Sequence, residues 1–230
     1  MRINGLTACV NYSDTLAAAL PRWMDRLASL TVVTDMADND TVDLVMSHPG
    51  VRIHRTNQFY KNGAHFNKSG SMEEAREEMP WEDWILFFDA DIIPPVDWYD
   101  KVVQFDPAPD SLYGCMRRQC GSLHGINDPN LPYIKQIIGL GYFQLFHSSD
   151  PLTIRRPLLK SYTNAAGYDN EFMDLWRKNG RRVRELPISV VHVGEIAQNW
   201  CGKGNETAMR RLVSERRRHR SWRHEEITSG

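Results

Sequence analysis

Two aspartates follow the most apolar segment of the chain. The run WILFF at 84–88 has the length and unbroken apolar character of a central parallel strand covered on both faces. It stops at Asp89 and Asp91, and Pro94 and Pro95 then prevent further ladder pairing, so the acidic pair should lie where this strand leaves the sheet. Adjacent carboxylates repel unless solvent, cations or a divalent metal neutralises them. We therefore interpret Asp89 and Asp91 as metal ligands; the alternative is a pair of turn-forming aspartates.

Polar residues also follow two earlier apolar segments. Asn11 and Tyr12 come after the predicted strand 6–10, and Asp35 ends the predicted strand 30–34. In open α/β sheets ligands bind at the carboxyl ends of the strands, which makes these residues candidates for a binding site. An aspartate after a strand is equally typical of a helix N-cap or a turn, so for Asp35 both interpretations stay open.

Lys68 is predicted to lie in the first turn of a helix that starts in FNKSGS. The helix macrodipole opposes a cation at this end unless an anion lies there as well. Lys68 is therefore a candidate phosphate or nucleotide contact, with a solvated surface lysine as the alternative.

Asp169 and His192 are candidates in the second half of the chain. Asp169 begins a helix whose Phe172 and Trp176 share one face, and a polar helix start would keep a catalytic carboxylate ionised. An aspartate here is also a good N-cap. His192 follows the apolar run 188–191, where a lone histidine can be structural or, as a neutral imidazole beside carboxylates, a metal ligand.

The order of apolar and helical segments predicts how these residues are positioned. Strands at 6–10, 30–34, 51–55 and 84–88 alternate with helices at 14–29, 38–46 and 67–79, and Pro21 should kink or split the first helix. The second half is less regular, with strands near 112–116, 141–147 and 182–193, a helix at 169–179, and a basic helical stretch at 205–220. We expect one α/β domain with a mostly parallel central sheet and a mixed C-terminal part.

Composition and cysteine content fit an ordinary globular domain. The chain has 230 residues, 41% hydrophobic and 25% charged, without an apolar run long enough to span a bilayer, and we expect a cytoplasmic protein. Four scattered cysteines favour reduced, buried thiols over a disulfide framework. A zinc site built from Cys115, Cys120, His124 and Cys201 is the alternative, although its spacing matches no recognised pattern.

The charge is unevenly distributed along the chain. Residues 201–230 carry a net charge of +4 and the preceding residues a net charge of −5. This asymmetry indicates an anionic partner for the basic C-terminal segment. It also leaves open a protein that binds nucleic acid through this segment alone.

The motifs together resemble the GT-A fold of nucleotide-sugar glycosyltransferases. The resemblance rests on the order of CVNYSD, VVTD, FNKSGSMEEA, FFDADIIPP, GYDNEF and HVG, and it covers roughly residues 6–204. It implies a Rossmann-like GT-A domain at 1–204, in which 1–110 bind the nucleotide sugar and 111–204 bind the acceptor, followed by a basic helical tail at 205–230. Tyr168 stands where the family usually has glutamate, a departure that concerns the acceptor contacts more than the base.

The resemblance implies a role for each candidate residue. Asp91 would ligate a metal that bridges the diphosphate, and Asp89 would contact the metal through water or lie near the ribose. His192 would complete the shell of Mn²⁺ or Mg²⁺, and Asp169 would be the catalytic base. The remaining residues would contact the nucleotide or its diphosphate, namely Asn11, Tyr12, Asp35, Lys68 and Lys203.

We therefore expect a metal-dependent hexosyl- or pentosyltransferase that moves a sugar from a nucleoside diphosphate, UDP in the first instance, to an acceptor hydroxyl. An inverting enzyme would use Asp169 as general base, and a retaining one would use it for positioning. Arginines of the tail and elsewhere could bind an anionic acceptor such as hydroxymethylated DNA or a glycan. One alternative is a sugar nucleotidyltransferase, although CVNYSD has no glycine for a phosphate loop. The other is the nucleic-acid-binding protein named above.

Overall fold

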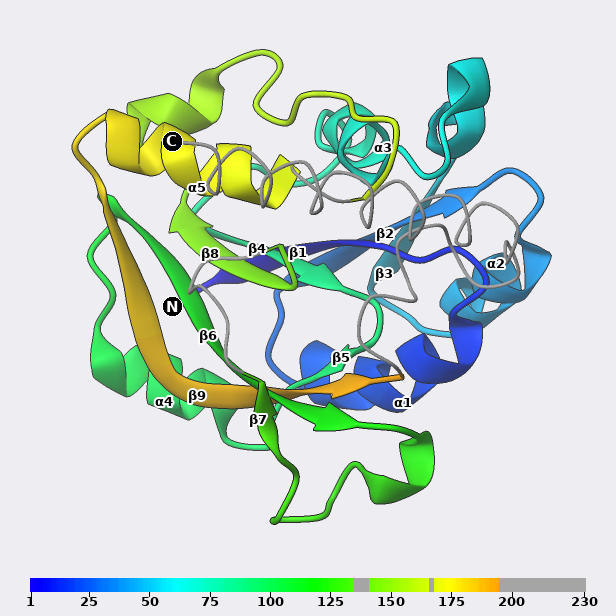
Figure 1. Ribbon diagram of the computed structural model, residues 1–230, viewed down its shortest axis with the longest axis horizontal. Helices are drawn as coiled ribbons and strands as arrows, with labels where there is room; N and C mark the ends of the chain where they lie inside the picture. Colours follow the sequence, from blue (N-terminus) through cyan, green and yellow to red (C-terminus); the bar gives the residue numbers. More distant parts are fainter. Residues whose placement is uncertain (135–140, 166–167, 195–230) are drawn as a thin grey trace, which may run out of the picture.

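The computed structural model describes residues 1–134, 141–165 and 168–194, which form a sheet with helices on both faces (Figure 1). The strands are β1 (Ile3–Ala8), β2 (Ser29–Asp35), β3 (Val51–Thr56), β4 (Trp84–Asp89), β5 (Ile92–Ile93), β6 (Ser111–Cys120), β7 (Tyr133–Ile134), β8 (Phe143–His147) and β9 (Arg182–Val193). The helices are α1 (Ser13–Met24), α2 (Asn39–Met46), α3 (Lys68–Ala75), α4 (Trp98–Phe105) and α5 (Tyr168–Lys178).

The strand order is β3-β2-β1-β4-β8-β6-β9-β5, and β7 pairs with β6. The first four strands of this order pair in parallel, as the alternation of strands and helices predicts. Beyond β4 the sheet is mixed, because β8 is antiparallel to β4 and β6 while β6 and β9 are parallel. The predicted fold class, a mostly parallel sheet with a mixed C-terminal part, is confirmed.

The aromatic residues of β4 explain why this strand is continuously apolar. Consecutive side chains of a strand point to opposite faces. Phe88 packs against Trp23 of α1 on one face, with ring centroids 4.4 Å apart, and Phe87 packs against Phe172 of α5 on the other, 5.9 Å apart. Each face therefore has its own hydrophobic core, one under α1 and α4 and one under α3 and α5.

Several helix boundaries differ from the predicted ones for local reasons. Helix α1 contains Pro21 without a break and ends at Met24, so the predicted split is wrong. Helix α3 begins after the cap Asn67, as predicted, but ends at Ala75, short of the expected Met79. The predicted basic helix at 205–220 lies outside the described residues.

Strand β5 and helix α4, which both follow the acidic pair, were not predicted, and neither was the short strand β7. The two-residue strand β5 pairs antiparallel to β9, placing Ile92 opposite His192, and α4 follows it. The chain therefore leaves the sheet at Asp89 but rejoins it before Pro94. Trp23 Nε1 of α1 donates to the carbonyl oxygen of Ile92 at 3.2 Å and fixes this short return.

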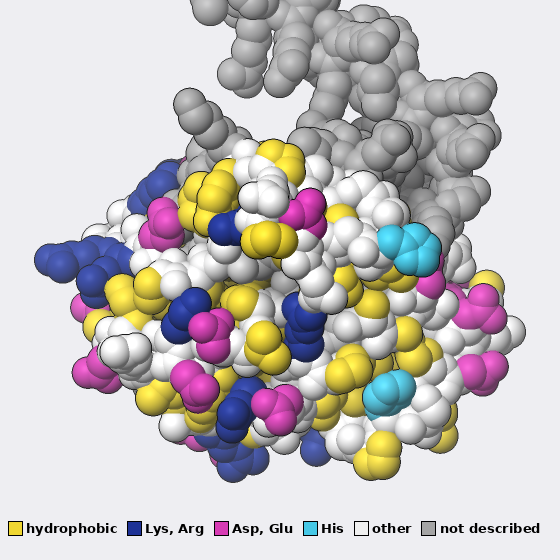
Figure 2. Space-filling model, turned by 90° about the horizontal axis from the view of Figure 1, so that it is seen from below, with side chains coloured by type: hydrophobic (Ala, Val, Ile, Leu, Met, Phe, Trp, Pro, Cys, Tyr) yellow, Lys and Arg dark blue, Asp and Glu magenta, His cyan; other side chains and the backbone are white. Residues whose placement is uncertain are grey.

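No helix among the described residues is long and apolar enough to cross a membrane. On the face drawn in Figure 2, basic and acidic side chains are interspersed among hydrophobic ones. The arginine pair at 117–118 is held by aromatic rings, since Arg117 lies 4.8 Å from the ring centroid of Tyr142 and Arg118 lies 4.5 Å from that of Tyr133.

Candidate functional site

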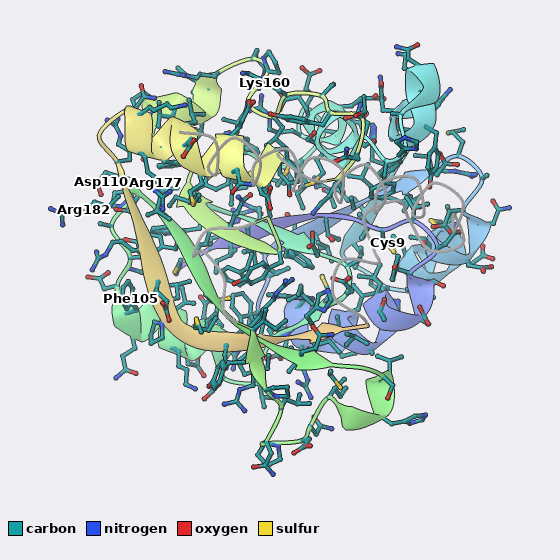
Figure 3. All side chains as sticks on the ribbon, in the orientation of Figure 1. Cys9, Phe105, Asp110, Lys160, Arg177 and Arg182 are labelled. Atoms are coloured by element: carbon teal, nitrogen blue, oxygen red, sulfur yellow. The ribbon has the colours of Figure 1, made fainter. Side chains whose placement is uncertain are left out.

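The candidate residues gather at one end of the sheet, where β1, β4, β6 and β9 finish. Ala8 of β1 is in register with Asp89 of β4, and Gln119 of β6 is in register with His192 of β9. In Figure 3, the labelled Cys9 marks this end, and Asp110 and Arg182 mark the opposite end, where β6 and β9 begin. The site therefore lies at the carboxyl ends of these strands, as the sequence predicts.

Lys68 and Asp89 form an ion pair inside the protein. The side chain of Asn67 caps α3 by accepting from the backbone N–H of Gly70 at 3.1 Å, and it also accepts from that of Tyr162 at 3.0 Å. This capped start directs Lys68 inward, where its residue is only 6% exposed and its Nζ contacts Asp89 Oδ1. The alternative of a solvated surface lysine is wrong.

The electrostatic environment keeps Lys68 charged. Burial opposes the ammonium form, but the Asp89 carboxylate outweighs it and raises the pKa of Lys68 above its ordinary value. The Tyr168 ring also lies beneath the ammonium, with its centroid 5.3 Å from Nζ. For Asp89, burial raises the pKa, Lys68 lowers it, and Asp91 raises it. Lys68 is thus the cation that makes this carboxylate tolerable beside a second one.

Asp91 and His192 face each other next to this ion pair. Asp91 Oδ2 lies 3.4 Å from His192 Nε2, and both residues are 6% exposed. The backbone fixes the approach, because the N–H of Val193 donates to the carbonyl oxygen of Asp91 at 2.9 Å. On the far side of the imidazole, Nδ1 lies 3.0 Å from Oε1 of Gln119. Sequence reasoning missed Gln119, because it stands in a polar strand end without a recognised motif.

The donor set of Asp91 and His192 fits a divalent metal. A carboxylate oxygen and an imidazole nitrogen suit Mn²⁺, and their separation is about that of two neighbouring ligands on one ion. In the described part of the chain, no three His, Cys, Asp or Glu side chains are grouped to hold a metal. Asp89 points to Lys68 instead, so the described residues offer two direct ligands at this point.

The loop after β1 is held by Asp38, the residue that caps α2. Asp38, 4% exposed, accepts from the backbone N–H of Asn11 at 2.7 Å, from Thr34 Oγ1 at 2.9 Å and from Thr41 Oγ1 at 2.7 Å. Asn11 has a positive φ of 59°, so the chain turns sharply here. The carboxylate therefore ties the ends of β1 and β2 to α2.

Tyr12 and Asp35 each follow a residue that donates to Asp38, namely Asn11 and Thr34. Burial is the main cause that raises the pKa of Tyr12, and the carboxylates of Asp91 and Asp14 raise it further. The charge of Asp91 therefore acts on the Tyr12 hydroxyl. Asp35 is half-buried at the end of β2, and its Oδ1 accepts from the backbone N–H of Ala37 at 2.9 Å. This hydrogen bond is typical of an aspartate in a turn.

Asp169 lies at the start of α5 and is joined to the acidic strand through two consecutive residues. Its Oδ2 accepts from the backbone N–H of Gly141 at 3.4 Å, and the carbonyl oxygen of Tyr142 accepts from the N–H of Asp89 at 3.3 Å. A Cβ on Gly141 would lie 2.6 Å from the Tyr168 hydroxyl, so only glycine allows this approach. Tyr168 itself is buried, and burial raises its pKa to about 12.

The other candidates are the cysteines and Lys203. Cys9, Cys115 and Cys120 are buried free thiols, as predicted, and Cys120 Sγ donates to the carbonyl oxygen of Ser122 at 2.9 Å. The zinc alternative finds no support among the described residues, and its fourth member Cys201 lies outside them. Lys203 also lies outside the described residues.

No protein-family model matches this chain, and no curated protein matches it in sequence. Solved structures do match. Glucosyl-3-phosphoglycerate synthase from Mycobacterium tuberculosis, in complex with Mn²⁺, UDP and phosphoglyceric acid, matches with a TM-score of 0.56 at 13% identity over 84% of this chain and 71% of that one.

Two further solved structures match over different lengths. 4-Diphosphocytidyl-2C-methyl-D-erythritol synthase from Anaerococcus prevotii has a TM-score of 0.51 at 12% identity over 92% of this chain and 98% of that one. A mycobacterial protein has a TM-score of 0.52 at 14% identity over 84% of this chain, which spans 65% of that protein. At these identities the likeness concerns the fold, and it shows that the chain folds like nucleotide-sugar transferases of Rossmann-like, GT-A type.

Proposed function

We propose that this protein is a metal-dependent glycosyltransferase that moves a sugar from a nucleoside diphosphate, in the first instance UDP, to an acceptor hydroxyl. The observation that carries the proposal is the pair Asp91 and His192, 3.4 Å apart at the carboxyl end of the sheet and beside the ion pair of Lys68 and Asp89. The fold likeness to an enzyme crystallised with Mn²⁺ and UDP supports the same interpretation.

Asp91 and His192 would hold the metal, as Mn²⁺ or Mg²⁺. When bound, such an ion neutralises the charge that develops on a departing diphosphate. Lys68 orients Asp89 and lowers its pKa, although burial and Asp91 raise that pKa on balance. The ionised Asp89 would then accept hydrogen bonds from the ribose or from metal-bound water. Asn11, Tyr12 and Asp35 would line the nucleotide side, and Lys203 would contact the diphosphate.

Asp169 would be the catalytic residue on the acceptor side. In a direct displacement, the acceptor oxygen bonds to the anomeric carbon, the bond from that carbon to the diphosphate oxygen breaks, and the acceptor proton passes to the Asp169 carboxylate. Asp169 is half-buried in the first turn of α5. In a retaining enzyme the same carboxylate would position the acceptor.

A sugar nucleotidyltransferase is the second candidate, because the matched synthase with a diphosphocytidyl product is covered over 98% of its length. The products distinguish the two reactions. A glycosyltransferase supplied with a nucleoside diphosphate sugar releases nucleoside diphosphate, whereas a nucleotidyltransferase supplied with a nucleoside triphosphate and a sugar 1-phosphate releases pyrophosphate. We expect metal-dependent diphosphate release from the first mixture, and pyrophosphate release from the second would overturn the proposal.

We further propose that the acceptor is anionic, such as hydroxymethylated DNA or a glycan, and is bound through the basic segment 205–230. The net charge of +4 on residues 201–230 supports this acceptor class.

A further inference from the structure

Gln119 is oriented by its two neighbours. Its Nε2 donates to the carbonyl oxygen of Gly194, and its Oε1 lies 3.0 Å from His192 Nδ1. A carbonyl oxygen can only accept, so the contact with Gly194 requires the amide nitrogen of Gln119 on that side. The amide oxygen must then face the imidazole.

This orientation decides which imidazole nitrogen carries the proton. An amide oxygen is also only an acceptor, so His192 Nδ1 must donate to it. In the neutral ring the other nitrogen, Nε2, is then left with a lone pair, and this is the atom 3.4 Å from Asp91 Oδ2. A lone pair and a carboxylate oxygen at that distance repel unless a proton on Nε2 or a metal cation lies between them.

We propose that Gln119 is a positioning residue that holds His192 as the Nδ1–H tautomer and thereby makes Asp91 and His192 a divalent-cation site. The proposal rests on the proposed function only for the identity of the cation. Strand register supports it, because Gln119 and His192 are paired on parallel strands and the N–H of Gly194 donates to the carbonyl oxygen of Cys120 at 2.9 Å. Outer hydrogen bonds of this kind fix the tautomer and ring orientation of metal-binding histidines.

Two substitutions separate this role from a purely structural one. Gln119→Met removes the acceptor for Nδ1–H and the donor to Gly194. Gln119→Glu keeps an acceptor for Nδ1–H but loses the donor to Gly194. If Gln119 serves only to hold Gly194, both variants should be equally impaired, whereas a role in fixing the tautomer predicts that only the methionine variant is. Gln104→Met on the exposed side of α4 is the matched control.

The experiment measures Mn²⁺ binding without nucleotide, by electron paramagnetic resonance of the free ion, on the full chain. We expect the affinity to fall about 10- to 100-fold in Gln119→Met, as for other outer-shell substitutions, and to stay near the wild-type value in Gln119→Glu and Gln104→Met. Nitrogen NMR of the metal-free protein in alkaline buffer should show the His192 proton on Nδ1 in the wild type and in Gln119→Glu.

Three results would overturn the inference: unchanged Mn²⁺ affinity in Gln119→Met, equal loss in both variants, or a wild-type proton on Nε2. Absence of Mn²⁺ binding to the wild type would remove the cation site as well. Because no sugar donor is used, the proposed function is tested separately. A protein that binds Mn²⁺ as described but transfers no sugar would retain this inference and lose the glycosyltransferase proposal.

Discussion

Lys68 illustrates how one buried cation can make two neighbouring carboxylates compatible with folding. It is 6% exposed, pairs with Asp89, and lies at the capped start of α3. Removing Lys68 leaves the half-buried Asp89 carboxylate without its cation.

We therefore predict that Lys68→Met lowers the free energy of unfolding by about 3 kcal/mol. The double variant Lys68→Met with Asp89→Asn should recover part of that loss, because the unpaired charge is gone. Urea denaturation measures both, with Lys61→Met on the exposed surface as control. A loss below about 0.5 kcal/mol, usual for surface substitutions, would show that the pair contributes little.

The thiol of Cys9 gives a pH dependence with a definite sign. Burial is the main cause that raises its pKa from 9.0 to about 12, so the folded state holds the proton longer than the unfolded chain does. Its contribution to stability is complete below pH 9 and declines as the pH rises toward 12. Cys9→Ala should flatten the fall in unfolding free energy over this range, and an unchanged slope in urea titrations at several alkaline pH values would contradict the assignment.

At the scale of elements, side-chain hydrogen bonds hold together the carboxyl edge of the sheet. Asp38 joins the ends of β1 and β2 to α2 through side-chain and backbone donors, and Trp23 of α1 holds β5 behind the acidic pair. The candidate residues are thus positioned by elements on both faces of the sheet.

We predict that Asp38→Ala lowers the free energy of unfolding by about 2 kcal/mol, the upper end for a lost N-cap, because several buried donors lose one acceptor. The substitution should also weaken nucleotide diphosphate binding, because Asp38 holds the backbone of Asn11 and Tyr12 comes directly after it. The half-buried Asp35→Ala is the comparison, with a smaller effect on stability expected. Thermal unfolding with and without nucleotide measures both quantities, and equal losses of unfolding free energy in the two variants without nucleotide would argue against a special role of Asp38.

The sequence predicted these elements unevenly, for physical reasons. The run 84–88 is apolar on both faces, and it is indeed a central strand with a separate core on each side. The two-residue β5 is too short to show any periodicity, and its pairing depends on β9, almost a hundred residues later in sequence. The role of Gln119 likewise depends on a strand pairing that local sequence does not encode.

For the whole molecule, the question is which basic residues would bind an anionic acceptor: the arginines of the described domain or those of the C-terminal segment. The described arginines at 117–118 stack on tyrosine rings, and Arg155 Nη2 donates to Asn179 Oδ1 at 3.2 Å. Because these arginines already have partners within the protein, the net positive charge of residues 201–230 is the stronger argument for an anionic acceptor.

Replacing Arg216, Arg217 and Arg218 with glutamine should weaken binding to an anionic acceptor such as DNA and reduce the slope of log affinity against log salt by about 2 to 3. UDP binding should be unaffected, because the triple variant leaves all the proposed donor contacts unchanged. Fluorescence anisotropy over a salt series tests this. Unchanged DNA affinity in the triple variant would exclude the segment from DNA recognition.

The central claim is that Asp91 is part of a metal-dependent nucleotide diphosphate site, and thermal stabilisation tests it most directly. A ligand that binds only the folded state at about 100 times its dissociation constant adds about 2.7 kcal/mol to stability. We predict that UDP, or another diphosphate of a small panel, raises the melting temperature only with Mn²⁺, that Asp91→Asn abolishes the shift, and that the exposed Asp97→Asn retains it. A shift that needs no metal, or that persists in Asp91→Asn, would contradict the claim.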